Sequence, residues 1–399
     1  MKKIIVFITI VLGSILLSGC DDLENLNPDI LASSLITSGN DFVLIYENQT
    51  LYGIGNNEKG QLGQPDDILF SSTKVEIPLE LNEDEIIVSL QAGYQHAGFL
   101  TSDGRVFMWG DNTNLQVLNR QDEVINTPTE ITALWNFETN EIVTSLELGG
   151  FHTGVITSTN RVVMFGLNTS GQIGNGKTSL SVGYYEMQYA LNASLKLALG
   201  NEHSGLVVDQ DIYVWGSNFN GQLGLGDVSN QVRPQRLNVT TFEEDEEVSI
   251  AFGVGVSMVY TNFGNLYGFG KSVYGLLGTN IEKDIFQPIS LDYLALEEDE
   301  FITDINFGYG HATFKTSSKR FLNIGSNTLS QLGTSNTTIL FSPLSVNDHV
   351  AFKQRDIADI VNGGFYQVVL LVDGTIFGTG YNTYVFDQDI PVITFQKIV

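Results

Sequence analysis

Short apolar strands recur along the chain at nearly constant intervals, and each of them ends at a glycine. These glycines lie 50 to 56 residues apart and are Gly55, Gly110, Gly166, Gly216, Gly270, Gly325 and Gly380. Large apolar residues alternate with other residues in front of each glycine, which is the two-residue period of a β-strand. No helical period competes with this pattern. The sequence therefore predicts an all-β chain built of seven similar units.

Each unit also carries turn and edge signals that indicate about four strands. Asn follows six of the seven glycines two residues on, where its side chain can close a turn. Dipeptides such as Asp103-Gly104 and Gly264-Asn265 suit two-residue hairpins. A proline stands 18 residues after four of the glycines (Pro128, Pro234, Pro288 and Pro343), which indicates an outer edge strand.

Seven such units over residues 36–399 predict a seven-bladed β-propeller of four-stranded blades. Residues 391–399 resemble an outer strand, and residues 37–46 supply an inner strand before the first glycine. We therefore expect the ring to be closed by pairing of the N-terminal and C-terminal strands within one blade.

The copies resemble the repeat of the regulator-of-chromosome-condensation family. Residues 213–226 read YVWGSNFNGQLGLG and are the nearest copy, whereas the second copy departs at Leu115 and Leu118 and the seventh from Val385 onward. Four histidines share one repeat position, three residues after a glycine: His96, His152, His203 and His311. The resemblance implies a structural hydrogen bond for them. A metal held by this ring is the alternative, but equivalent positions in neighbouring blades lie too far apart for one coordination shell, so we expect no metal and no cofactor.

The first twenty residues read MKKIIVFITIVLGSILLSGC and resemble a bacterial lipoprotein signal. A short basic start precedes an apolar stretch of signal-peptide length, and the only cysteine ends a small-residue cleavage motif. We expect residues 1–19 to be a signal peptide, Cys20 to carry a diacylglyceryl group, and residues 20–35 to form a tether. The expected location is the bacterial cell envelope, anchored to a lipid bilayer in the periplasmic or the surface leaflet; an ordinary signal peptide is the alternative.

The net charge of the chain limits the classes of molecule that it can bind. There are 46 acidic against 19 basic residues, a formal net charge of −27, so nucleic acid is excluded as a partner. Acidic clusters precede the inner strand of several units, so we expect them on one rim of the disc; their residues include Glu83, Asp84, Glu85, Glu243, Glu244, Asp245, Glu297, Glu298 and Asp299. They are either solvated loops that keep strand edges apart or a rim that attracts a cationic partner or loosely holds divalent cations.

No catalytic motif is present: there is no G-x-S-x-G, no H-E-x-x-H and no phosphate-binding loop. We expect a monomeric, non-enzymatic scaffold that binds an unidentified protein. One alternative is an inhibitor of an extracellular enzyme, because β-lactamase inhibitor proteins include propellers of this repeat class. Another is a lyase or glycan-acting enzyme at the mouth of the axial channel. A scaffold should expose aromatic residues on one face, whereas an enzyme should bring two carboxylates together in a pocket.

Overall fold

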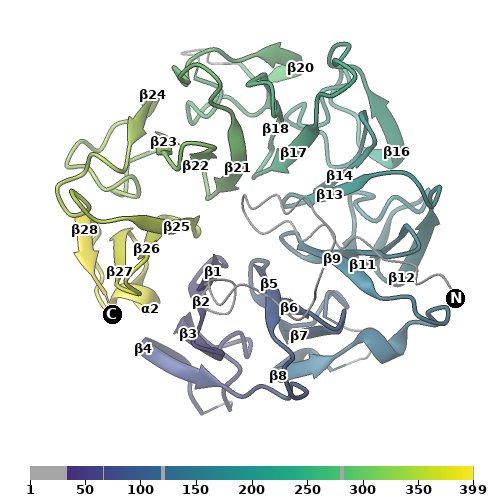
Figure 1. The fold of residues 1–399 in the computed structure, drawn as a ribbon, viewed down its shortest axis with the longest axis horizontal. Coiled ribbons are helices and arrows are strands. Elements are labelled where there is room, and N and C mark those ends of the chain that lie inside the picture. The colour runs from purple at the N-terminus through teal and green to yellow at the C-terminus, as the bar shows by residue number, and fades with distance from the viewer. Residues whose placement is uncertain (1–33, 66, 118–121, 279–282, 399) are drawn as a thin grey trace, which may run out of the picture.

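Seven four-stranded antiparallel sheets stand around a central axis in the computed structural model (Figure 1). The structure describes residues 34–65, 67–117, 122–278 and 283–398. Each sheet is one contiguous piece of chain, and its strands run from the axis outward in sequence order. The predicted seven-bladed propeller is therefore confirmed. The expected signal peptide and Cys20 lie outside the described residues.

Blades are numbered in chain order, from blade 1 (β1–β4) to blade 7 (β25–β28). The innermost strands are β1 (Leu35–Ser38), β5 (Ile87–Ala92), β9 (Val143–Leu148), β13 (Leu195–Leu199), β17 (Val248–Phe252), β21 (Ile302–Phe307) and β25 (Ile357–Asn362). The second strands are β2 (Phe42–Glu47), β6 (His96–Thr101), β10 (His152–Thr157), β14 (His203–Val208), β18 (Val256–Thr261), β22 (His311–Thr316) and β26 (Tyr366–Leu371). The third strands are β3 (Thr50–Asn56), β7 (Val106–Asp111), β11 (Arg161–Asn168), β15 (Asp211–Gly216), β19 (Leu266–Gly270), β23 (Phe321–Gly325) and β27 (Ile376–Gly380).

The outermost strands are β4 (Phe70–Ile77), β8 (Val124–Glu130), β12 (Ser179–Gln188), β16 (Gln231–Leu237), β20 (Ile285–Ser290), β24 (Leu340–Ser345) and β28 (Val392–Lys397). All four prolines that predicted an edge lie on these strands. Helix is confined to a 3-10 turn (Thr132–Leu134) and α2 (Thr383–Phe386) within the described ranges. In this part of the chain no helix has the length and apolar character needed to cross a membrane.

The seven repeated glycines lie at or near the ends of the third strands, where only glycine fits. Their φ angles run from 98° to 117°, a region that L side chains rarely adopt. A Cβ on Gly55 would lie 2.3 Å from the carbonyl oxygen of Asp41, and one on Gly110 would lie 2.5 Å from that of Gln95. The pairing with the outermost strand shifts register beside Gly110 and its equivalents. The glycine pattern thus reflects a close backbone approach within each blade.

Large side chains fill the space between neighbouring blades. Trp109 and Trp215 are fully buried, and each indole Nε1 donates to a backbone carbonyl of the preceding blade, to Gln61 at 2.9 Å and Gln172 at 2.8 Å respectively. Because each sheet hides one apolar face against the next, a blade cannot be stable by itself, and closure of the ring completes the core.

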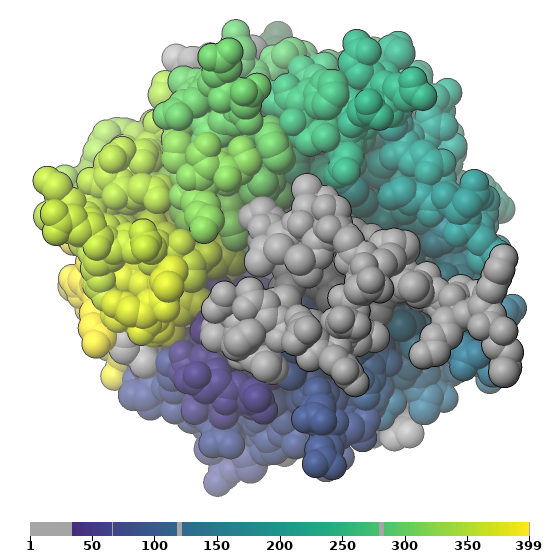
Figure 2. Space-filling view, viewed as in Figure 1, coloured from purple at the N-terminus to yellow at the C-terminus, as the bar shows by residue number. Residues whose placement is uncertain are grey.

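The ring does not close as expected. The strands β1 and β28 belong to different sheets, and residues 37–46 form parts of two strands, β1 and β2, where one was expected. The first and last described strands therefore belong to neighbouring blades, and closure comes from packing of blade 1 against blade 7, seen side by side in Figure 2. An apolar cluster joins Ile36, Val43 and Ile45 of blade 1 to residues of blade 7. The hydroxyl of Tyr366 adds a hydrogen bond to the carbonyl oxygen of Phe42 at 2.8 Å.

Candidate functional site

Seven turns, each joining the first strand of a blade to its second, converge on the axis and form what we call the axial mouth. Each turn begins with a glycine: Gly39, Gly93, Gly149, Gly200, Gly253, Gly308 and Gly363. Backbone hydrogen bonds link one turn to the next at six of the seven steps, for example from Tyr94 N to Gly150 O at 3.1 Å. A Cβ on Gly93 would lie 2.5 Å from the carbonyl oxygen of Gly149. The glycines therefore let the turns approach closely enough to form a rigid ring.

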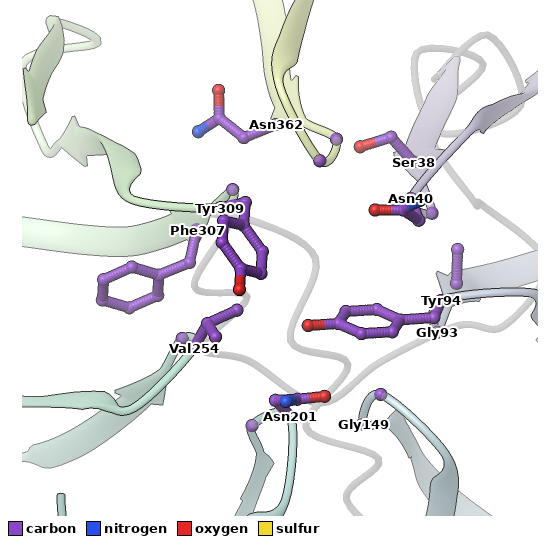
Figure 3. A pocket seen from close by; sticks show the side chains of 18 of the residues that line it. Ser38, Asn40, Gly93, Tyr94, Gly149, Asn201, Val254, Phe307, Tyr309 and Asn362 are labelled. Atoms are coloured by element: carbon purple, nitrogen blue, oxygen red, sulfur yellow. The ribbon is translucent and has the colours of Figure 1, made fainter. Parts of the chain in front are cut away.

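A hollow of about 130 Å³ lies within this ring and is lined by all seven blades. The residue after each turn glycine faces it and differs from blade to blade: Asn40, Tyr94, Gly150, Asn201, Val254, Tyr309 and Gly364. Figure 3 shows that Tyr94 and Tyr309 reach toward the axis from opposite sides, with Asn201 between them at one edge. The mouth is thus a regular backbone ring that carries an irregular set of side chains.

Three polar atoms of the hollow are buried without a hydrogen-bond partner among the described residues. They are Ser38 Oγ, Tyr94 OH and Asn201 Oδ1. Buried polar atoms are nearly always paired, so three orphans around one hollow indicate positions that a ligand would satisfy. Burial, together with the nearby Tyr309 and Glu202, holds the pKa of Tyr94 well above its usual value. Its hydroxyl therefore stays protonated and can both donate and accept.

Aromatic side chains surround the hollow on the same face. Tyr94 contacts Phe151 with ring centroids 5.1 Å apart, and Tyr309 contacts Phe365 at 5.3 Å. Phe365 is 39% exposed, and Phe219, in the loop after β15, is 72% exposed. The mouth face thus exposes aromatic residues, as expected of a scaffold, although Phe263 in the turn between β18 and β19, at the opposite end, is exposed as well.

The four histidines lie in the inter-blade core, outside the hollow. All four are fully buried, and their Nε2 atoms reach the following blade. His152 Nε2 lies 2.9 Å from Ser204 Oγ, which itself donates to the carbonyl of Gln172 at 2.8 Å, so the imidazole donates to the serine. His203, Ser257 and Gln222 repeat this arrangement one blade further on. Burial lowers the pKa of His152 and His203 to about 3, so both are neutral.

The acidic clusters lie in the loops from an outermost strand to the next innermost strand. Because strands alternate in direction, these loops are at the end of the disc opposite the mouth. One carboxylate near the end of each acidic loop is buried, and these residues are Glu85, Glu141, Glu246 and Glu300. Glu85 is only 6% exposed and pairs with Arg105 at 2.6 Å, so its assignment to an open rim is wrong. The other residues expected on the rim are exposed: Glu83, Asp84, Glu243, Glu244, Asp245, Glu297, Glu298 and Asp299.

Each buried carboxylate closes its own loop. Glu300 Oε2 accepts from the backbone N–H of Glu297 at 2.9 Å and from Arg320 at 2.6 Å, and its Oε1 accepts from Thr316 at 2.5 Å. Burial alone would raise the pKa of Glu300, but these hydrogen bonds and the charge of Arg320 outweigh it and lower the pKa. The repeated acidic residue is thus a loop-closing element.

The sequence analysis missed two carboxylates on the innermost strands, Glu147 on β9 and Asp304 on β21. Burial raises the pKa of Glu147 to about 8, and the nearby Asp304 increases this shift. Desolvation beside the neighbouring blades raises the pKa of Asp304 as well, although this residue is exposed, and the nearby Asp359 adds to the shift. Lys315 lies 3.3 Å from Asp359. The signal in the sequence that could have identified each of them is a single acidic residue within a predicted inner strand. Neither carboxylate lines the hollow, and within the described ranges no three potential ligands gather around a metal position.

Comparisons with known proteins agree with the repeat. Residues 87–116 and 209–260 match family models described as Regulator of chromosome condensation (RCC1) repeat. The chain is 30% identical over 297 residues to the ultraviolet-B receptor UVR8 of Arabidopsis thaliana, covering 73% of this chain and 64% of that protein. It is 23% identical to the E3 ubiquitin-protein ligase HERC2 of Homo sapiens, covering 84% of this chain but 7% of the ligase. The chain thus spans less than two thirds of the length of these relatives.

Solved structures show the same fold. Human WBSCR16 superposes with a TM-score of 0.73 at 18% identity, covering 88% of this chain and 94% of that one. Prp20p of Saccharomyces cerevisiae, described with its binding to Gsp1p and histones, superposes with a TM-score of 0.70 at 19% identity, covering 84% and 81%. The chain therefore contains RCC1 repeats and folds as an RCC1-like propeller.

Proposed function

We propose that this chain is a protein-binding propeller that docks its partner on the face bearing the axial mouth. The observation that carries the proposal is the hollow in which three polar atoms lack a hydrogen-bond partner among the described residues, on a face that also exposes Phe219 and Phe365. Aromatic residues around a desolvated pocket are typical of the energetic centre of a protein interface. A ring already held by hydrogen bonds loses little freedom on binding, which favours affinity.

Protein binding is favoured over catalysis by the groups that line the hollow. They are amides, phenols, a hydroxyl, apolar side chains and backbone, and the two carboxylates with raised pKa values lie outside the hollow. The binding of Gsp1p and histones by Prp20p, a propeller of the same fold, adds support. An inhibitor of an extracellular enzyme would be a special case, and its target would be among the captured proteins.

The proposal extends to a membrane tether. The basic and apolar start and the motif ending at Cys20 support lipidation of that cysteine and a place in the bacterial cell envelope. Metabolic labelling with a fatty acid should mark the chain, and a Cys20→Ala variant should lose the label. Unchanged incorporation in the variant would remove the tether and leave the docking face untouched.

The docking face is tested by capture from an envelope extract with three forms of the chain. The first is unaltered, the second carries Phe219→Ala and Phe365→Ala, and the third carries Glu244→Ala on the opposite face as a matched control. A protein retained by the first and third forms but lost from the second supports the proposal. Retention of glycans or small molecules only, or equal retention by all three forms, would contradict it.

A further inference from the structure

We propose that the partner inserts one cationic side chain, of lysine or arginine, into the hollow of the axial mouth. This inference rests on the proposed function and names the chemistry that the mouth selects. It is carried by the size of the hollow, its unpaired atoms, its aromatic rings and the charges around it.

The size of the hollow admits one extended side chain. Its volume of about 130 Å³ is close to that of a protein cavity of roughly 150 Å³ that holds one benzene molecule. An α-helix with its side chains is about 10 Å across, so no helix enters such a space. A partner must therefore lie on the face and send a single side chain inward.

The unpaired atoms suit a group that only donates hydrogen bonds. Asn201 Oδ1 can only accept, while the hydroxyls of Tyr94 and Ser38 can accept as well as donate. A lysine ammonium has three donors and an arginine guanidinium has five, and neither has an acceptor. A cationic head could thus donate to Asn201 Oδ1 and to the Tyr94 hydroxyl, which reaches toward the axis in Figure 3, whereas a carboxylate would leave Asn201 Oδ1 unpaired.

The tyrosine rings provide a second attraction for a cation. A cation within about 6 Å of an aromatic ring face is held by the ring quadrupole. The same face already contains one such contact, because Lys271 Nζ lies 4.8 Å from the centre of the Tyr274 ring. Tyr274 in turn contacts Tyr309, which reaches into the hollow, at 6.4 Å. Tyr94 and Tyr309 offer an inserted head the same kind of contact from two sides.

The nearby charges are mainly negative. Glu202 follows Asn201 in its turn and acts on the pKa of Tyr94. Asp41 follows Asn40 in the turn of blade 1. The nearby Lys59 is paired with Asp111 at 3.6 Å, and Lys271 is engaged with Tyr274. With a net charge of −27 over the chain, the field favours a cation at the mouth.

The test uses the purified chain with 3-fluorotyrosine in place of tyrosine, followed by ¹⁹F NMR. The probes are N-acetyl-lysine amide and N-acetyl-arginine amide, with the neutral N-acetyl-norleucine amide as a control of similar length. We expect saturable shifts of the Tyr94 and Tyr309 signals, assigned with single Tyr→Phe variants, for one or both cationic probes. Whichever cation binds more tightly identifies the side chain.

Variants distinguish binding of the probe in the hollow from a general attraction of cations to the acidic chain. Asn201→Ala and Glu202→Gln should weaken the binding of the cationic probe about fivefold or more, since the first removes an acceptor and the second removes a counter-charge. Glu298→Gln, on the opposite face, should change its affinity by less than about twofold. Retained folding of each variant is checked by its far-ultraviolet circular dichroism.

Two results would overturn this inference. Equal affinity for norleucine amide would mean that the hollow takes an apolar side chain. Shifts that never saturate, or that respond equally to Glu298→Gln, would mean that no site for a cation exists. Either result leaves the capture experiment free to succeed, so failure of the inserted cation is distinguishable from failure of the docking face.

Discussion

The two ends of the disc are built from the same repeats but differ in what their polar groups do. At the end that carries the acidic loops, the repeated carboxylates are buried and bonded to their own loops, as in Glu300 with Arg320 and Thr316. At the axial mouth, the backbone repeats but the side chains do not, and three polar atoms remain unpaired. Residues that recur in phase are thus structural, and binding is expected where the blades diverge.

The largest expected effect is the loss of folding stability at acid pH, which we attribute to the repeated histidines of the inter-blade core. Burial lowers the pKa of His96, His152 and His203 to about 3 and of His311 to about 4, below the value of 6.5 of a free side chain. Their stabilising effect is therefore complete above pH 6.5 and is lost as the pH falls toward 3. At pH 5 the loss should be about 2 kcal/mol for each histidine, measured by urea unfolding.

The two carboxyls on the innermost strands, Glu147 and Asp304, oppose this loss of stability. The pKa values of Glu147 and Asp304 are raised in the folded chain, so protonating them on acidification favours the folded state. A variant with Glu147→Gln and Asp304→Asn should therefore lose stability more steeply between pH 7 and pH 5 than the unaltered chain. Equal slopes would show that these two groups do not titrate in that window.

The next effect concerns the buried ion pairs at the end opposite the mouth. Glu141→Ala removes a fully buried carboxylate that pairs with Arg161 at 2.9 Å and leaves the guanidinium without one partner. The free energy of unfolding should fall by about 3–5 kcal/mol. The exposed neighbour Glu138 provides the control, since Glu138→Ala should stay within about 0.5 kcal/mol. If both variants changed the free energy of unfolding by equally small amounts in urea, the ion pair of Glu141 would not contribute to stability.

The mouth should behave in the opposite way, with little effect on stability and a clear effect on binding. Tyr94→Phe removes a buried hydroxyl that has no partner among the described residues, so the free energy of unfolding should change by less than about 1 kcal/mol, and any change should be a small gain in stability. Retention of the captured partner should nevertheless fall about fivefold or more. If Tyr94→Phe instead lowered the stability strongly and left partner retention unchanged, the mouth would be structural and the comparison of the two ends would be wrong.

The smallest effect concerns the loop in which blade 2 departs from the repeat. Leu115 has a φ of 62° where blades 1, 3, 4 and 5 have Gly60, Gly171, Gly221 and Gly275. Leu115→Gly should relieve about 1 kcal/mol of backbone strain and lose part of that to the flexible unfolded chain. We expect a gain of about 0.5 kcal/mol in thermal unfolding; a loss of stability would show that the Leu115 side chain contributes more by packing.

Periodicity made the fold predictable from the sequence, and the absence of periodicity hid the candidate site. Gly110 and Pro128 could be assigned to the end of a third strand and to an outermost strand, because equivalents of each recur at a constant position in the repeat. A close backbone approach requires the glycine, and an edge strand tolerates the proline. Ring closure was misjudged because residues 37–46 contain two short strands and a tight turn that read as one strand. Tyr94 and Asn201 gave no signal, since only the folded ring brings residues of seven separate turns around one axis.

The docking of a partner on the mouth face is tested most directly by site-specific photo-crosslinking of the captured complex. The photoreactive residue p-benzoylphenylalanine is placed at position 219, beside the mouth, or at position 244, on the opposite end. We predict that the partner becomes covalently attached from position 219 and not from position 244. Attachment from position 244 alone would contradict the assignment of the binding face.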